Sequence, residues 1–352
     1  MGKKGVSAVV TTVILLALAL IAVGIVWAVI QNILVDRTDM INIANSMVEL
    51  EIESVNVVDE GVNVAVKRKP GKGEMKGIRV AIGEQVFDIN GDLAELATGV
   101  YLIPNANLTG DVAIAPILET SSGTGVGGVA DTQEVDSDYL MDNLDGLVGY
   151  WPFEGNVNDA SGNGNDGTNN GVEFVDGKVN SAGIFDGVGD DVSIGTIDDL
   201  ISSSELTIGA WIKLGSGPRD IYSTLLSDSW SKWFFVFDNS GTRTDNHFYF
   251  RVRDLNGLHV SSGDVILPDD DAWHHVAGVA DETKGVFLYV DGALKSSSTE
   301  STFDFVVANG DVFLGSKDGT EGEFFNGEMD EIIILNRALS EGEINSIYSL
   351  SK

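Results

Sequence analysis

The feature that most constrains this chain is a long uncharged run near its N-terminus. Between Lys4 and Asp36 no residue is charged, and most side chains are aliphatic, as in VTTVILLALALIAVGIVWAVI. As a helix, these 31 residues would span roughly 46 Å at about 1.5 Å per residue, whereas about 20 residues cross a bilayer core. Because the run is apolar on all sides, such a helix must be buried all round, in lipid or among copies of itself.

The flanks of this run argue against an ordinary secretory signal. A short basic leader, Lys3-Lys4-Gly5, stands directly before it, and the small-residue site at residues 17–19 is followed by more apolar residues. This arrangement resembles the class III signal peptide of archaeal type IV pilins and archaellins. The resemblance implies that a prepilin peptidase cuts between Gly5 and Val6, and that residues 1–47 comprise the signal peptide and an apolar pilin-type helix.

The same resemblance implies where the protein is found and what it binds. Residues 6–35 would be inserted in the membrane before assembly, with the N-terminus cytoplasmic and everything after Asp36 outside. The helices of many copies would then pack into a homo-oligomeric filament on the cell surface. Bacterial type IV pilins carry a glutamate at the fifth mature position, where this chain has Val10, and this favours the archaeal type. A membrane anchor that is not cleaved and never polymerises is the alternative.

Composition excludes several classes of function. The chain has 352 residues and a formal net charge of −33, from 54 acidic and 21 basic side chains. A surface this acidic repels nucleic acid, so we expect no nucleic-acid partner. There is no cysteine, which rules out disulfides and thiolate metal sites.

Residues 48–119 are predicted to form a small antiparallel β-sandwich, similar in size and position to the head of an archaeal pilin. Apolar and acidic residues alternate from Val48 to Glu53, as in a half-buried strand, and further short strands follow between Gly and Pro residues. Asn107 begins the sequence Asn-Leu-Thr, an acceptor site for glycosylation. Residues 120–138 are rich in Gly, Ser and Thr and then acidic, which predicts a flexible linker.

The remaining residues, 139–352, carry short strand patterns separated by turns, which predicts an antiparallel sandwich or jelly roll. Five stretches resemble the laminin G-like branch of the concanavalin A-like lectin/glucanase fold: LVGYWPFEGNVNDASGNGNDGT, GIFDGVGDDVSI, LTIGAWIK, WHHVAGVADETKGVFLYVDG and FFNGEMDEIIILNRALSEGEINSIY. The resemblance implies a two-sheet jelly roll that binds carbohydrate or protein, often with one calcium ion. The expected fold class is therefore mainly β, with one long N-terminal helix.

A calcium site is the first chemical hypothesis. The loop at residues 156–167 is rich in Asn, Asp, Ser and Gly, whose oxygens suit a hard cation. The resemblance pairs Asp159 of this loop with Asp330 at the start of the last strand, and Asn163 is a lesser candidate. The alternative is that Asp159 caps a turn and Asp330 is a solvated strand residue.

A glycan-binding rim is the second hypothesis. Trp230 and Trp233 lie beside Ser and Lys in LLSDSWSKWFF, where a ring on a loop could stack against a sugar. The polar neighbours that would bind sugar hydroxyls are Tyr222, Arg251 and Asp254. Packing at the edge of the sandwich is the alternative for both Trp rings, and the other three Trp residues of this part, Trp151, Trp211 and Trp273, are expected in the core.

Catalysis is not expected. Hydrolases of this fold carry E-x-D-x-E or E-x-D-x-x-E on one strand, and here Glu328-Met329-Asp330-Glu331 is followed by two Ile residues. The sequence therefore predicts a surface filament subunit that displays a lectin domain for adhesion or for recognition of a glycan or a surface protein. A membrane-anchored lectin is the first alternative, and a cell-surface glycan hydrolase is the second.

Overall fold

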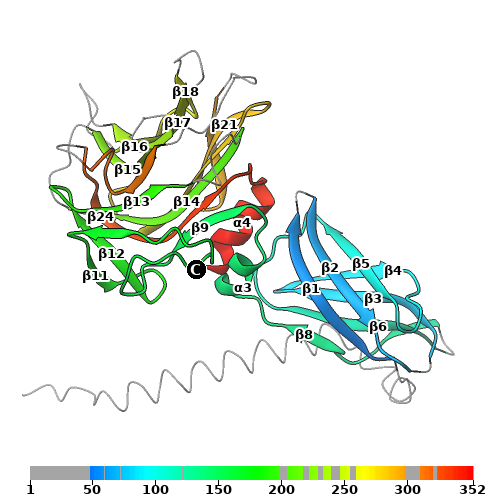
Figure 1. The fold of residues 1–352 in the computed structure, drawn as a ribbon. Coiled ribbons are helices and arrows are strands. Elements are labelled where there is room, and N and C mark those ends of the chain that lie inside the picture. Colours follow the sequence, from blue (N-terminus) through cyan, green and yellow to red (C-terminus); the bar gives the residue numbers. More distant parts are fainter. Residues whose placement is uncertain are drawn as a thin grey trace, which may run out of the picture. The chain divides into compact units, whose positions relative to one another are not determined.

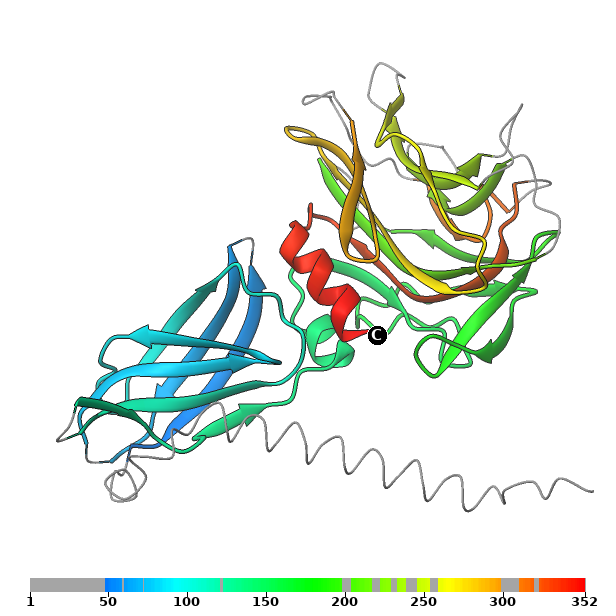
Figure 2. The same cartoon turned by 180° about the vertical axis from the view of Figure 1, so that it is seen from behind.

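The computed structural model describes residues 48–58, 60–71, 73–120, 123–197, 204–216, 222–228, 233–238, 246–253, 259–298, 310–319 and 323–351. The chain divides into two compact units, and apart from residues 57–59 the division falls between Val135 and Asp136 (Figures 1 and 2). The predicted cleavage site at Gly5 and Val6 and the pilin-type helix of residues 1–47 lie outside the described residues. Within the described ranges, no helix has both the length and the apolar character that a membrane span requires.

The first unit consists of two antiparallel sheets. One has the strand order β1-β2-β5 and the other β4-β3-β6-β7, with β8 also paired to β6. The apolar residues that alternate along these strands are buried: Val62, Val64 and Val66 of β2 and Ile78 and Val80 of β3 have no exposed surface. The strands are β1 (Leu50–Val58), β2 (Gly61–Arg68), β3 (Met75–Ile82), β4 (Gln85–Asn90), β5 (Thr98–Pro104), β6 (Val112–Thr120), β7 (Gly123–Val126) and β8 (Asp131–Gln133).

The structure corrects the linker that the sequence predicted at residues 120–138. Thr120 ends strand β6, and β7 and β8 then both pair with β6, through Ile117↔Val126 and Ile114↔Asp131 among others. Helix α3 (Ser137–Asp142) begins directly after this unit, with Asp136 as its N-cap. The predicted linker up to Val135 therefore belongs to the first unit, and eight of its residues lie in strands of that unit's second sheet.

The second unit is a sandwich of two eight-stranded sheets. One sheet has the order β11-β12-β24-β14-β20-β21-β22, with β9 paired to β24, and the other has the order β10-β13-β23-β15-β16-β17-β18, with β19 paired to β17. The paired strands within both sheets run antiparallel, which confirms the predicted jelly-roll sandwich. The strands are β9 (Leu147–Trp151), β10 (Thr168–Asn170), β11 (Glu173–Asp176), β12 (Ser181–Asp186), β13 (Asp191–Thr196), β14 (Glu205–Leu214), β15 (Tyr222–Asp228), β16 (Trp233–Asp238), β17 (His247–Arg253), β18 (His259–Ser261), β19 (Val265–Ile266), β20 (Trp273–Asp281), β21 (Gly285–Val290), β22 (Ala293–Ser297), β23 (Asp311–Leu314) and β24 (Asn326–Leu335).

A single apolar core fills this sandwich. It joins alternate residues of both sheets, such as Ile212 and Met329 from the first and Phe235 and Phe250 from the second. Helix α4 (Glu341–Leu350) ends the described chain and begins with a capping box, in which Ser340 and Glu343 bond each other's backbone N–H groups.

Candidate functional site

A row of residues crosses five strands of the β9-containing sheet on the side that faces away from the core. The paired residues are Glu173↔Ile184, Ile184↔Glu328, Glu328↔Lys213 and Lys213↔Trp273. Directly opposed residues on neighbouring strands project on the same face of a sheet. The strand neighbours of this row, such as Met329 and Ile212, lie in the core, so the row itself points outward. We call Glu173, Ile184, Glu328, Lys213 and Trp273 the outer row.

Four of these residues line a pocket with a volume of about 650 Å³. Its wall also includes the turn after β12, the loop after β14 and Asp271, which precedes β20. The polar side chains on its wall are Glu173, Asp186, Asp190, Lys213, Ser216, Asp271, Asn326 and Glu328. Five carboxyl groups therefore face one ammonium group, and this pocket is strongly acidic.

Lys213 links two of the carboxylates. Its Nζ lies 3.4 Å from Oε1 of Glu328 and 3.3 Å from Oδ1 of Asp271. Burial acts to lower the pKa of Lys213, but the negative charges of Glu328 and Asp271 outweigh it and raise the pKa. The ammonium group is thus held between two anions, and its charge is already balanced before any ligand binds.

The turn after β12 forms the opposite rim. The Asp186 N–H donates to Oδ2 of Asp190 at 2.9 Å, and Oδ1 of Asp186 accepts from the N–H groups of Val188 and Gly189. Burial raises the pKa of Asp190, and the nearby carboxylates of Asp186 and Glu173 add to this rise. These bonds hold two acidic side chains at the pocket in a fixed turn.

Next to the outer row, the turn between β11 and β12 covers the same face of the sheet. This turn buries Asp330. Asp330 pairs with Trp211 across the sheet and has no exposed surface. The turn between β11 and β12 lies over it: the Val179 N–H donates to Oδ2 of Asp330 at 2.9 Å, and Nζ of Lys178 lies 4.5 Å from the Trp211 ring centre. Burial raises the pKa of Asp330 to about 8, against the backbone donors that act to lower it. Asp330 is therefore a buried residue, not the solvated strand residue of the alternative reading.

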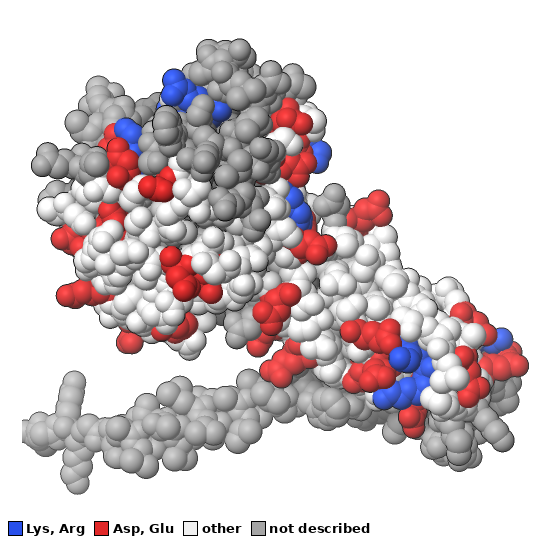
Figure 3. Space-filling model, viewed as in Figure 1, with Lys and Arg blue, Asp and Glu red and all other residues white. Residues whose placement is uncertain are grey.

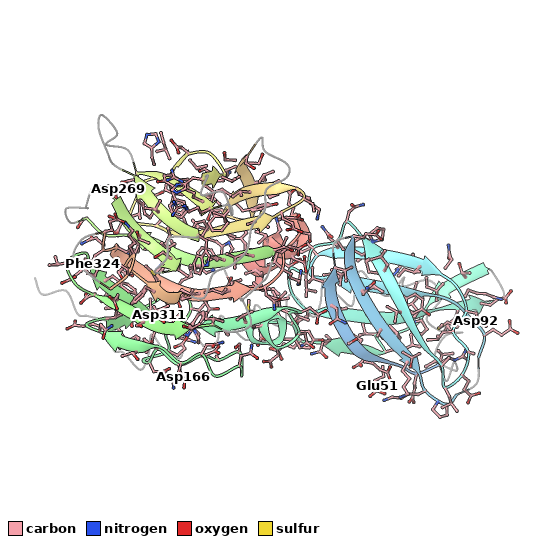
Figure 4. The ribbon with its side chains drawn as sticks, turned by 45° about the horizontal axis from the view of Figure 1, so that its top comes forward. Glu51, Asp92, Asp166, Asp269, Asp311 and Phe324 are labelled. Carbon is pink, nitrogen blue, oxygen red and sulfur yellow. The ribbon has the colours of Figure 1, made fainter. Side chains whose placement is uncertain are left out.

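Asp159 organises the Asn/Gly loop. Its Oδ1 accepts the N–H groups of Tyr150 at 3.0 Å and Ser161 at 2.9 Å, and its Oδ2 accepts that of Asn165 at 2.9 Å. Its own N–H donates to Oδ1 of Asp166, which Figure 4 labels. Burial acts to raise the pKa of Asp159, but hydrogen bonds from the Ser161 side chain and from the three backbone N–H groups outweigh it and hold the pKa below its usual value. The carboxylate therefore fixes the conformation of the loop.

The predicted calcium ligands have separate hydrogen-bonding partners in the structure. Asp159 bonds its own loop, whereas Asp330 bonds Val179 and the Glu331 N–H. The amide nitrogen of Asn163 donates to the carbonyl oxygens of Leu147 and Val148. No group of three or more His, Asp or Glu residues suited to a metal occurs within the described ranges. Calcium binding stays a prediction, and the geometry gives both carboxylates another role.

The aromatic rim predicted from the sequence is corrected at Trp233. This residue begins β16, has no exposed surface and belongs to the core, so its ring offers no face to a sugar. Arg251 lies on β17, with its guanidinium 4.4 Å from the Tyr249 ring centre and Nη1 3.2 Å from Nδ1 of His259. Trp230, Asp254 and the side chain of Tyr222 lie outside the described residues. Asn107 is partly exposed in the loop between β5 and β6, as glycosylation would require.

Sequence reasoning missed most of the pocket. Only Glu328 was considered, as part of a broken catalytic motif, and Trp273 was assigned to the core although it is only partly buried. Two signals were present: Lys213 is the one basic residue in the apolar strand ELTIGAWIKL, and Asp186 and Asp190 flank a Gly-rich turn. Neither signal identifies a pocket until the strand register shows that these residues lie close together.

Comparison with known proteins supports the fold of the second unit. Residues 185–345 match a laminin G family model described as the concanavalin A-like lectin/glucanases superfamily. No curated protein matches the chain.

Solved structures that match the chain include a domain of an arabinanase and binding domains of a mosquitocidal protein and a botulinum neurotoxin. Domain 4 of AbnA, an extracellular arabinanase from Geobacillus stearothermophilus, was solved with arabinotriose; it is 21% identical over 57% of this chain and 97% of that one, with a TM-score of 0.46. The binding domain of Paraclostridial Mosquitocidal Protein 1 is 18% identical over 58% of this chain and 52% of its own, with a TM-score of 0.48. The receptor-binding domain of botulinum neurotoxin C/D mosaic serotype is 15% identical over 58% and 51%, with a TM-score of 0.46. The chain thus spans about half the length of these toxin chains. Over residues 185–345, the second unit is thus similar to the laminin G-like domains of the concanavalin A-like superfamily.

Proposed function

We propose that this protein recognises glycans on a surface, through the pocket of its second unit, without cleaving them. The observation that carries the proposal is the outer row, which brings carboxylates, an ammonium group and a partly exposed Trp from five strands to one face. Carboxylates accept hydrogen bonds from sugar hydroxyls, and the Trp273 ring offers a surface on which a sugar could stack. The family match adds support, because its description names lectins.

The charge of the pocket argues for a class of ligand. Five carboxyl groups and one ion-paired lysine repel uronic, sialic and sulfated sugars, and favour neutral or amino sugars. The rest of the surface adds to this selection, since acidic side chains outnumber basic ones on the face that Figure 3 shows. A glycan array probed with the full chain tests this: neutral or amino sugars should dominate the bound set, and a bound set dominated by acidic sugars would refute it.

Binding without hydrolysis is proposed from the last strand. A hydrolase of this fold needs two carboxyl groups facing the substrate. Here Glu328 lines the pocket, but Asp330 is buried beneath a turn and Glu331 accepts a hydrogen bond from Oη of Tyr150 at 2.8 Å. We therefore expect no release of reducing ends from polysaccharides. If release occurs and Glu328→Gln abolishes it, the hydrolase alternative holds.

Display on a filament is proposed from the N-terminal sequence alone. The basic leader and the apolar run that follows it favour class III processing, a membrane-inserted precursor and assembly of copies through their N-terminal helices. Mass spectrometry of the surface protein tests this. A mature chain that begins at Val6 supports filament assembly, and an intact Met1 or Gly2 favours the membrane-anchored lectin.

A further inference from the structure

The β1-β2-β5 sheet of the first unit has two edges of different character. On the β1 edge, the Ile52 N–H donates to Oδ2 of Asp131 at 2.8 Å, so a side chain caps this edge. Acidic residues line β1, and Nζ of Lys67 on the neighbouring strand β2 lies 2.9 Å from Oε1 of Glu53. Charge and capping are the means by which proteins keep an edge strand from pairing with another chain. The β1 edge is protected in this way.

The β5 edge has no charged residue of its own, and Pro104 at its end is its only residue of a kind that blocks pairing. Strand β5 pairs with β2 on one side, and within the described ranges no strand pairs with it on the other. From Leu96 to Gly110 the sequence has no charged residue. Leu96, Val100 and Leu102 are 65%, 67% and 38% exposed, and they are three of the six large apolar side chains that are exposed in the described part of the chain. Three of these six exposed side chains thus lie in one stretch of seven residues, which includes most of β5.

The charge of the protein limits where a second copy can approach. Two copies with a net charge of −33 each repel one another over most of their surfaces. An uncharged, apolar strand is the place where two copies can approach without that repulsion. An antiparallel pair of identical strands is also self-complementary about a two-fold axis, so one surface serves both partners.

We propose that β5 pairs antiparallel with β5 of a second copy, about a two-fold axis at Val100. In this register Val100 lies opposite itself and Thr98 lies opposite Leu102 of the second copy, and the two three-stranded sheets become one. The pairing buries the apolar edge and supplies partners for its free backbone groups. It depends neither on glycan binding nor on N-terminal processing.

Cysteine cross-linking tests the pairing, because the natural chain has no cysteine and each introduced thiol is unique. The variants are Thr98→Cys, Val100→Cys and Leu102→Cys in the full chain in detergent micelles, oxidised alone and in pairwise mixtures. Directly opposed strand residues have the spacing that a disulfide needs. The controls are Gln85→Cys, exposed at the start of edge strand β4 in the same unit, and Val188→Cys, 78% exposed in the second unit.

The proposal predicts a covalent dimer of Val100→Cys alone, and a dimer from the mixture of Thr98→Cys with Leu102→Cys. The yield should exceed that of either control by at least tenfold. A dimer from Val100→Cys mixed with Leu102→Cys would support the pairing and move its centre to Tyr101. Dimers at none of the three positions, or in the same yield as the controls, would overturn the proposal. Glycan binding by the same variants should be unchanged, which separates this result from the proposed function.

Discussion

Replacing Asp159 by Ala should destabilise the second unit by about 2–5 kcal/mol. Its carboxylate accepts three backbone N–H groups, from Tyr150, Ser161 and Asn165. A donor left unsatisfied in a buried place costs about 1–3 kcal/mol, and a bond to a charged group is stronger than average. Asp159 is only partly buried, so water will replace some of these bonds, and the sum is reduced accordingly.

Urea unfolding of the full chain, followed by Trp fluorescence, measures this loss. Five of the six Trp residues lie in the second unit, so the signal reports mainly on that unit. Asp166→Ala is the matched control: its exposed carboxylate accepts one N–H group in the same loop, and the expected loss is about 0.5–1.5 kcal/mol. A loss below about 1 kcal/mol for Asp159→Ala would refute the account of this loop.

Unfolding in calcium and in EDTA distinguishes a loop-fixing role of Asp159 from a metal-binding role. If the carboxylate acts through the backbone alone, Asp159→Ala lowers the free energy of unfolding by the same amount in calcium and in EDTA. If Asp159 is a calcium ligand, calcium stabilises the natural protein and the substitution abolishes that gain. The second result would support the metal site predicted from the sequence.

Three further predictions follow from single residues. Gly177→Ala should cost about 1–3 kcal/mol in the same urea titration, because a Cβ would lie 2.7 Å from Oδ2 of Asp330 and 2.5 Å from the Ser181 carbonyl carbon; an unchanged midpoint would contradict the close packing of this turn. Burial lowers the pKa of His275 from 6.5 to about 4, so between these values the unfolded chain binds a proton that the folded chain does not. The free energy of unfolding should therefore fall by about 2 kcal/mol from pH 7 to pH 5 because of His275. His275→Phe should remove this contribution, and an equal fall in the variant would contradict the assignment to His275. A bulky residue in place of Gly5 should block both cleavage and filament assembly, as mass spectrometry and microscopy of sheared surface material would show; cleavage that persists would contradict the class III reading.

Much of the fold was predictable because local patterns and burial agree. The stretch ELTIGAWIKL became β14, and the strand patterns around it became one sandwich. The linker was mispredicted for a physical reason: Gly123–Val126 lacks apolar periodicity and is a strand only because Ile117–Thr120 pairs with it. A strand that depends on a neighbouring strand has no local signature.

The site was less predictable, because it depends on strand register. Glu173 and Glu328 are far apart in sequence, and both contact the pocket only because Ile184 of β12 pairs with each of them. Trp233 shows the converse, since polar neighbours suggested a rim while the register of β16 directs its ring into the core. Asp159 is predicted as a calcium ligand, with a turn cap as the alternative, and in the structure its carboxylate accepts backbone N–H groups.

The most direct test of the account is the affinity of a pocket variant for a neutral glycan bound by the natural protein. Isothermal titration of the full chain should give a dissociation constant in the micromolar to millimolar range, or about −8 to −4 kcal/mol. Glu328→Gln removes one pocket charge and its pairing with Lys213, and should weaken binding at least tenfold. Lys295→Met, at an exposed position on β22, is the control and should bind as the natural protein does. Equal affinities for the natural protein and Glu328→Gln would contradict the assignment of this pocket as the glycan site.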